Sequence, residues 1–229
     1  MSDLPPTGRV MSQAANKLPL TRRAWFIATW VICSGLMVFA GFIFVAFKNA
    51  GAMMAMMPIQ MPIDGEAEYE KRMLKLKAAA SELDRFYALG DAALWSVDVG
   101  KLDDAERYAN ELLVLNTKTG RDWNNGNAIH KAHSTLGRVA IKRGDVTEGE
   151  RQLGLAASSK GSPQMDTFGP NMSLPRDLLA TRKASAKAAV LAYFDYLPTF
   201  WTMDNGAIRV WRSDVENDRT PNFGAHLLF

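Results

Sequence analysis

The sequence predicts an all-α protein in which one transmembrane helix is followed by a solenoid-like domain of paired helices. Three observations support this fold class: an uncharged apolar run of 23 residues, apolar residues at helical spacing from residue 64 onward, and an internal repetition. On this basis the chain divides into a cytoplasmic tail (1–24), a transmembrane helix (25–47), a Met/Pro-rich tether (48–63) and a helical domain (64–229).

The apolar run at 25–47 has the length that a bilayer requires, since its hydrocarbon core is crossed by roughly 20 helical residues. Trp25 and Trp30 lie near one end of the run, where indole rings favour the membrane interface. Four basic residues precede the run, and only Lys48 follows it closely. Because Lys and Arg resist translocation, we expect a single-pass inner-membrane protein with its C-terminal domain in the periplasm. A cleaved signal peptide is the alternative, but its apolar region would be only about 7–15 residues long.

Methionines crowd the segment that follows the predicted span. Thioether sulfur is a soft ligand suited to Cu(I), so copper binding is one interpretation of this segment. The other is an apolar, adaptable tether, in which Pro58 and Pro62 end the membrane helix. We expect no cofactor. If copper does bind, the candidate ligands are Met53, Met54, Met56, Met57 and Met61.

Charge argues against nucleic-acid binding by the domain outside the membrane. The chain has 27 basic and 24 acidic residues, and residues 1–47 hold four and one of these, which leaves 23 of each. Nucleic-acid-binding domains present a basic face, and a balanced domain does not indicate one. Cys33 is the single cysteine and lies inside the predicted span, so the chain cannot form an internal disulfide.

Helical signals continue from Asp64 to the C-terminus. Asp64 can cap a first helix, with acidic residues near the helix's positive end. Further on, Ser173 can cap a short helix, a second one should end before Pro198, and a last one should contain Trp211. Apolar residues at three- and four-residue spacing mark the first helix: Tyr69, Met73, Leu76, Ala80 and Leu83.

Residues 100–109 and 144–153 align with each other. Each begins with a glycine that permits a turn, and the small residue five positions later, Ala105 or Gly149, permits close helix packing. Both stretches resemble the turn and second helix of a tetratricopeptide repeat, and Gly137 takes the place of a glycine in that repeat's first helix. The repeat spans about 34 residues, whereas the two glycines lie 44 apart, which indicates a loop insertion between the units.

A narrower resemblance covers residues from about 86 to 229. The region is similar to a group of bacterial tetratricopeptide-repeat-like proteins of unassigned function, a resemblance that implies the fold and no chemistry. The stretches that carry it are Asp122-Trp123-Asn-Asn-Gly-Asn127-Ala-Ile-His130, Gly161-Ser-Pro163, Phe168-Gly-Pro-Asn171-Met-Ser-Leu174 and Pro221-Asn-Phe223-Gly-Ala-His226-Leu.

Two polar loops, 117–130 and 158–173, should lie side by side at one edge of such a solenoid. Loops held by a rigid scaffold often carry function, so their residues are candidates for binding a partner protein. The alternative is structural, because Asn side chains cap helices and turns. The candidate partner-binding residues are Trp123, Asn125, Asn127, His130, Asn171 and Met172, with Asn124 beside them.

Catalytic signatures are missing from the sequence, so we do not expect an enzyme. No nucleophile elbow, Walker loop or dinucleotide-binding glycine loop is present. His130 and His133 share the spacing of two metal ligands on one helix face, but no Cys or carboxylate pair accompanies them. We expect a membrane-anchored protein-binding scaffold or accessory subunit of a membrane complex. The alternative is an extracytoplasmic module that binds a small ligand or copper.

Overall fold

The computed structural model describes residues 64–119 and 123–228 and is all-helical, with no strand among these residues. The all-α part of the predicted fold class is therefore confirmed. Asp64 caps the first helix as expected, since its carboxylate accepts hydrogen bonds from two backbone N–H groups. The helices are α2 (Gly65–Lys77), α3 (Glu82–Asp98), α4 (Leu102–Thr119), α5 (Asn125–Lys142), α6 (Val146–Ala157), α7 (Pro163–Phe168), α8 (Ser173–Ala180), α9 (Ala184–Tyr196) and α10 (Ala207–Glu216), with 3₁₀ turns at η1 (Leu197–Thr199) and η2 (Gly224–Leu227).

The transmembrane part of the predicted fold class, and the inner-membrane location that depended on it, are corrected. Across residues 64–119 and 123–228, no helix is both long enough and apolar enough to cross a bilayer. The segment on which the prediction rested, 25–47, and the methionine tether both lie outside the described residues.

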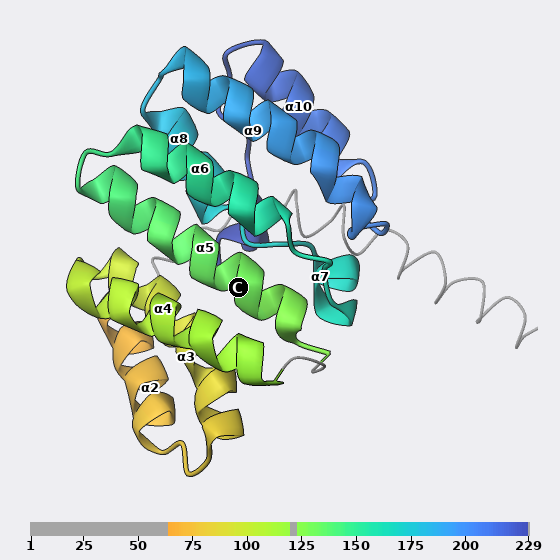
Figure 1. The fold of residues 1–229 in the computed structure, drawn as a ribbon. Helices are drawn as coiled ribbons and strands as arrows, with labels where there is room; N and C mark the ends of the chain where they lie inside the picture. The colour runs from red at the N-terminus through yellow and green to blue at the C-terminus, as the bar shows by residue number, and fades with distance from the viewer. Residues whose placement is uncertain (1–63, 120–122, 229) are drawn as a thin grey trace, which may run out of the picture. The chain divides into compact units, whose positions relative to one another are not determined.

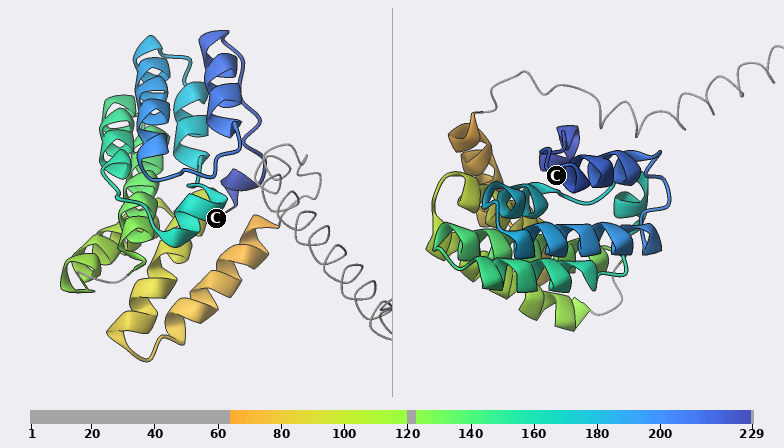
Figure 2. Two further views of the ribbon diagram at one scale, coloured as in Figure 1. Left: turned by 90° about the vertical axis from the view of Figure 1, so that its right-hand side faces the viewer. Right: turned by 90° about the horizontal axis from the view of Figure 1, so that it is seen from above.

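Three helix pairs of the same design make up most of the domain. The turns between α3 and α4, α5 and α6, and α8 and α9 each have three residues, with the middle one in the left-handed region. Gly100 (φ +77°) and Gly144 (φ +92°) occupy this position in the first two turns, as predicted, and Arg182 (φ +56°) occupies it in the third. Successive pairs pack through α4 against α5 and α6 against α9, an arrangement consistent with an α-solenoid (Figures 1 and 2).

Small residues let these helices approach closely. A β-carbon placed on Gly137 would lie 2.6 Å from Cδ2 of Leu174, so α8 packs directly on the backbone of α5. A β-carbon on Gly149 would lie 2.7 Å from Cγ1 of Ile141, and Ala105 is fully buried. The positions that the repeat alignment assigned to close packing therefore do pack closely. A relationship to tetratricopeptide-repeat proteins stays a prediction.

The C-terminal segment closes the domain over an aromatic core. His226 lies 5.1 Å from the ring of Trp201 and 5.0 Å from that of Trp211, measured between ring centroids. Its backbone carbonyl accepts a hydrogen bond from the N–H of Met172, just before α8. Ser173 was predicted to cap α8, but it is the first residue of the helix. Its own N–H donates to Oδ1 of Asn171, so the Asn171 side chain holds the start of α8.

Candidate functional site

The segments 117–130 and 158–173 lie side by side, as the sequence predicted, but they are not loops throughout, since 125–130 form the start of α5 and 163–168 form α7. Oγ of Ser159 donates a hydrogen bond of 2.8 Å to the carbonyl of Gly126, at the start of α5. Only glycine fits at position 126, because a β-carbon there would overlap the backbone carbonyl of Gly161. Oγ of Ser162, which caps α7, donates to Oδ1 of Asn127 at 2.9 Å. The start of α5 and the start of α7 are thereby joined by side-chain and backbone contacts.

A pocket of about 300 Å³ opens beside this junction. Trp123 lies at its edge with 58% of its surface exposed, and the indole is 6.2 Å from the ring of Tyr87. An exposed tryptophan beside a concave surface is the kind of residue on which binding energy concentrates in protein interfaces. The residues that line the pocket come from α2, α3, α4, α5, α7 and the turn before α5: Lys75, Phe86, Tyr87, Gly90, Asp91, Leu112, Trp123, Asn124, Asn127, Ala128, Lys131 and Gln164.

Side-chain amides form one wall of this pocket. Nδ2 of Asn127 donates to Oε1 of Gln164 at 2.9 Å and to Oδ1 of Asn124 at 2.5 Å. Asn127 itself is buried, with both ends of its amide engaged. These contacts hold the polar wall in place and join α5 to α7.

An ion pair also lines the pocket. Nζ of Lys131 is 2.5 Å from Oδ1 of Asp91, and Arg72 approaches the other carboxylate oxygen at 4.0 Å. Burial alone would raise the pKa of Asp91, but Lys131, Arg72 and Lys75 outweigh it, and the pKa of Asp91 is lowered. Asp91 is therefore ionised at neutral pH, and the pocket combines an aromatic edge, neutral amides and a closed ion pair.

The predicted partner-binding residues divide into exposed and buried sets. Trp123 is exposed and Asn125 is half-buried, whereas the other four are buried. Residues buried within the domain cannot form the contact surface directly, so these four brace the loops instead. Met172, which is completely buried, and His130, which is 2% exposed, illustrate this role; Asn127 and Asn171 are the other two.

His130 is a hydrogen-bonding core residue. Its Nε2 forms a 2.7 Å hydrogen bond with the hydroxyl of Tyr193 on α9. Burial lowers the pKa of His130 to about 3, with smaller contributions from Lys131 and His133, so the imidazole is neutral at neutral pH. His133 instead bonds Oε1 of Gln152 through Nδ1, at 2.7 Å. The two histidines therefore have separate partners. Over the described ranges, no group of three or more His, Cys, Asp or Glu side chains is arranged to hold a metal ion.

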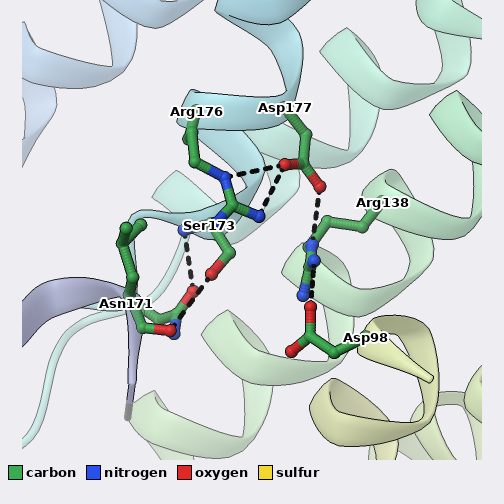
Figure 3. A network of polar contacts seen from close by, with 7 residues as sticks. Asp98, Arg138, Asn171, Ser173, Arg176 and Asp177 are labelled. Atoms are coloured by element: carbon green, nitrogen blue, oxygen red, sulfur yellow. Dashed lines mark hydrogen bonds and ion pairs between the residues drawn. The ribbon is translucent and has the colours of Figure 1, made fainter. Parts of the chain in front are cut away.

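A buried charge network that the sequence did not reveal joins α3, α5 and α8. Arg138 is 2% exposed and donates to Asp177 at 2.8 Å and to Asp98 at 2.6 Å. The second carboxylate oxygen of Asp177 accepts from Arg176, so Asp177 lies between two guanidinium groups (Figure 3). Burial alone would raise the pKa of Asp177, but the two arginines outweigh it and the pKa is lowered. The network joins three helices by hydrogen-bonded ion pairs.

Helical spacing could have identified part of the pocket. Tyr87 and Asp91 are four residues apart on α3, as are Asn127 and Lys131 on α5, so each pair lies on one helix face. No sequence signal indicated that these two faces oppose each other across about 40 residues of chain.

Comparisons with protein-family models, curated protein sequences and solved structures found no match to this chain.

Proposed function

We propose that this chain is a protein-binding scaffold or accessory subunit of a protein complex, and that it binds its partner at the pocket beside Trp123. The observation that carries the proposal is an exposed indole, in contact with the ring of Tyr87, at the edge of a pocket with a fixed amide wall. Stacked helix pairs commonly present such surfaces to peptides and proteins.

The chemistry of the pocket indicates how a partner segment would bind. A side chain of moderate size would enter the pocket beside Tyr87 and Trp123, and the backbone or a polar side chain of the segment would hydrogen-bond to Asn124 or Gln164. The ion pair between Asp91 and Lys131 is already satisfied, so it favours no particular charge on the partner. Amides and aromatic rings suit an uncharged, mixed polar and apolar segment.

The test compares Trp123→Ala with Val114→Ala in the full-length chain. Both residues are exposed, at 58% and 57%, but Val114 lies on α4 and does not line the pocket. We expect Trp123→Ala to lose a stoichiometric partner in co-purification and to weaken its binding by about 2 kcal/mol or more. Val114→Ala should retain the partner, and both variants should melt close to wild type.

Two results would reject this site. In one, Trp123→Ala retains the partner with unchanged affinity. In the other, Trp123→Ala melts far below wild type and Val114→Ala does not, which would assign the indole a role in holding the loop.

Binding of a small ligand in the same pocket is the second candidate function. Its volume of about 300 Å³ is at the lower end of the range for small-molecule sites. A neutral ligand with an aromatic ring and an amide would match the lining. A protein that shows no stoichiometric partner, but whose melting temperature rises with such a ligand in wild type and not in Trp123→Ala, would favour this candidate.

A further inference from the structure

A second cavity, of about 810 Å³, lies at the far side of the third helix pair. It is bounded by the α8–α9 turn, the start of α9 and the segment that follows α10. Four cations and one acidic residue line it, although residues 48–229 as a whole carry equal numbers of each sign. The charged lining residues are Arg182, Lys183, Lys187, Arg219 and Asp218.

Two of these cations are already paired. Nζ of Lys187 lies 2.6 Å from Asp218 and also donates to the carbonyl of Glu216 at the end of α10, whereas Arg219 pairs with Asp214 at 2.9 Å. Arg182 and Lys183 are exposed and make no ion pair or side-chain hydrogen bond with the described residues. They are the charges that remain available to a ligand.

Helix stability does not account for the two free cations. Arg182 holds the left-handed conformation (φ +56°) at the turn position where Gly100 and Gly144 stand in the other two pairs. A side chain with a β-carbon is disfavoured there, so the arginine costs stability that glycine would not. Lys183 is also unfavourable next to the positive end of α9, because the first turn of α9 has no acidic residue to offset it, whereas the first turns of α4 and α6 do.

We infer that this cavity binds a small organic ligand that carries phosphate groups, with Arg182 and Lys183 contacting the phosphates. Guanidinium and ammonium groups together suit phosphate oxygens, the first in bidentate fashion and the second as a point charge. The volume exceeds what a lone phosphate needs and falls within the range of small-molecule sites. Leu179 and Val215 supply an apolar wall for the organic part of the ligand. This site is separate from the Trp123 pocket and does not depend on the function proposed there.

The test is calorimetric titration of the full-length protein with inorganic pyrophosphate at constant ionic strength, beside citrate as a polycarboxylate probe. Wild type should bind pyrophosphate, and Arg182→Gly and Lys183→Ser should each bind about tenfold or more weakly, because each loses a charge-assisted contact. Lys142→Ser removes the same charge from an exposed site outside the cavity and should bind like wild type.

Thermal melting without ligand separates binding from folding. Arg182→Gly should melt at or above the wild-type temperature, since glycine accepts the left-handed turn, and Lys183→Ser should do the same by adding a helix cap. The proposal is overturned if wild type does not bind pyrophosphate, or if both cavity variants bind it like wild type. Equal binding of citrate and pyrophosphate would also overturn the assignment to phosphate.

Discussion

The buried charge network at Arg138 predicts which of two substitutions, Asp177→Ala or Arg138→Met, lowers the stability of the fold more. Asp177→Ala removes one of the two carboxylates that neutralise Arg138, a guanidinium with only 2% of its side chain exposed. Removing one partner of a buried pair typically costs about 3–5 kcal/mol of unfolding free energy. Arg138 still pairs with Asp98 in this variant, but the Asp98 side chain is 36% exposed, and water screens part of that interaction.

Removing the arginine should cost less than removing the carboxylate. In Arg138→Met, Asp177 keeps the guanidinium of Arg176 at 2.8 Å, and Asp98 can be hydrated, so no buried charge is left alone. The loss is then about 1–3 kcal/mol, from charged hydrogen bonds. The double variant Arg138→Met/Asp177→Leu should be more stable than the sum of the single effects predicts, because it removes both buried charges.

Urea unfolding followed by circular dichroism would measure these differences, with the free energy of unfolding taken from the midpoint and slope of each transition. The reasoning is refuted if Arg138→Met destabilises the protein as much as Asp177→Ala does. Additive effects in the double variant would also contradict the account, since coupling through a shared buried pair would then be absent.

Two further predictions concern packing and acid stability. Gly137→Ala should lower the free energy of unfolding by about 1–3 kcal/mol, because the added β-carbon meets α8. Gly154→Ala, in open space on α6, should raise it by about 0.5–1 kcal/mol. Shifts of the same sign for both variants in urea unfolding would contradict this reasoning. His130 and His226 have pKa values lowered by burial to about 3 and about 4, so each stabilises the fold above pH 6.5, and that stability is lost as the pH falls toward those values. From pH 7 to pH 5 the loss should be about 2 kcal/mol for each histidine, and a total below about 1 kcal/mol would refute the assignment.

Local features of the fold were predictable because their causes are local. Gly100 and Gly144 marked turns since the left-handed conformation favours glycine, and Gly137 marked a close helix contact since a side chain would not fit. Neighbouring loops at one edge followed from the paired-helix arrangement. The exposure of Trp123 agrees with its selection as a contact residue, although its binding role stays a prediction.

Long-range features were not predictable, for reasons that the structure makes plain. Arg138 finds its two partners 40 and 39 residues away, on helices whose relative rotation no sequence spacing specifies. Asn171 and His130 have polar side chains that suggested a surface, but hydrogen bonds to Ser173 and Tyr193 allow them to be buried. An apolar run and its flanking residues suggested the membrane span, and the structure supports no such helix among the residues it describes.

Photo-crosslinking from position 75 tests the central claim most directly. Lys75 is exposed and lines the pocket, and replacing it leaves the Trp123 indole in place. Benzoylphenylalanine at position 75 in the full-length chain should give one discrete adduct with a partner protein, identified by mass spectrometry. The same group at Val114, which is exposed on α4 outside the pocket, should give none. No adduct from position 75, or the same adducts from both positions, would contradict a protein-binding surface at this pocket.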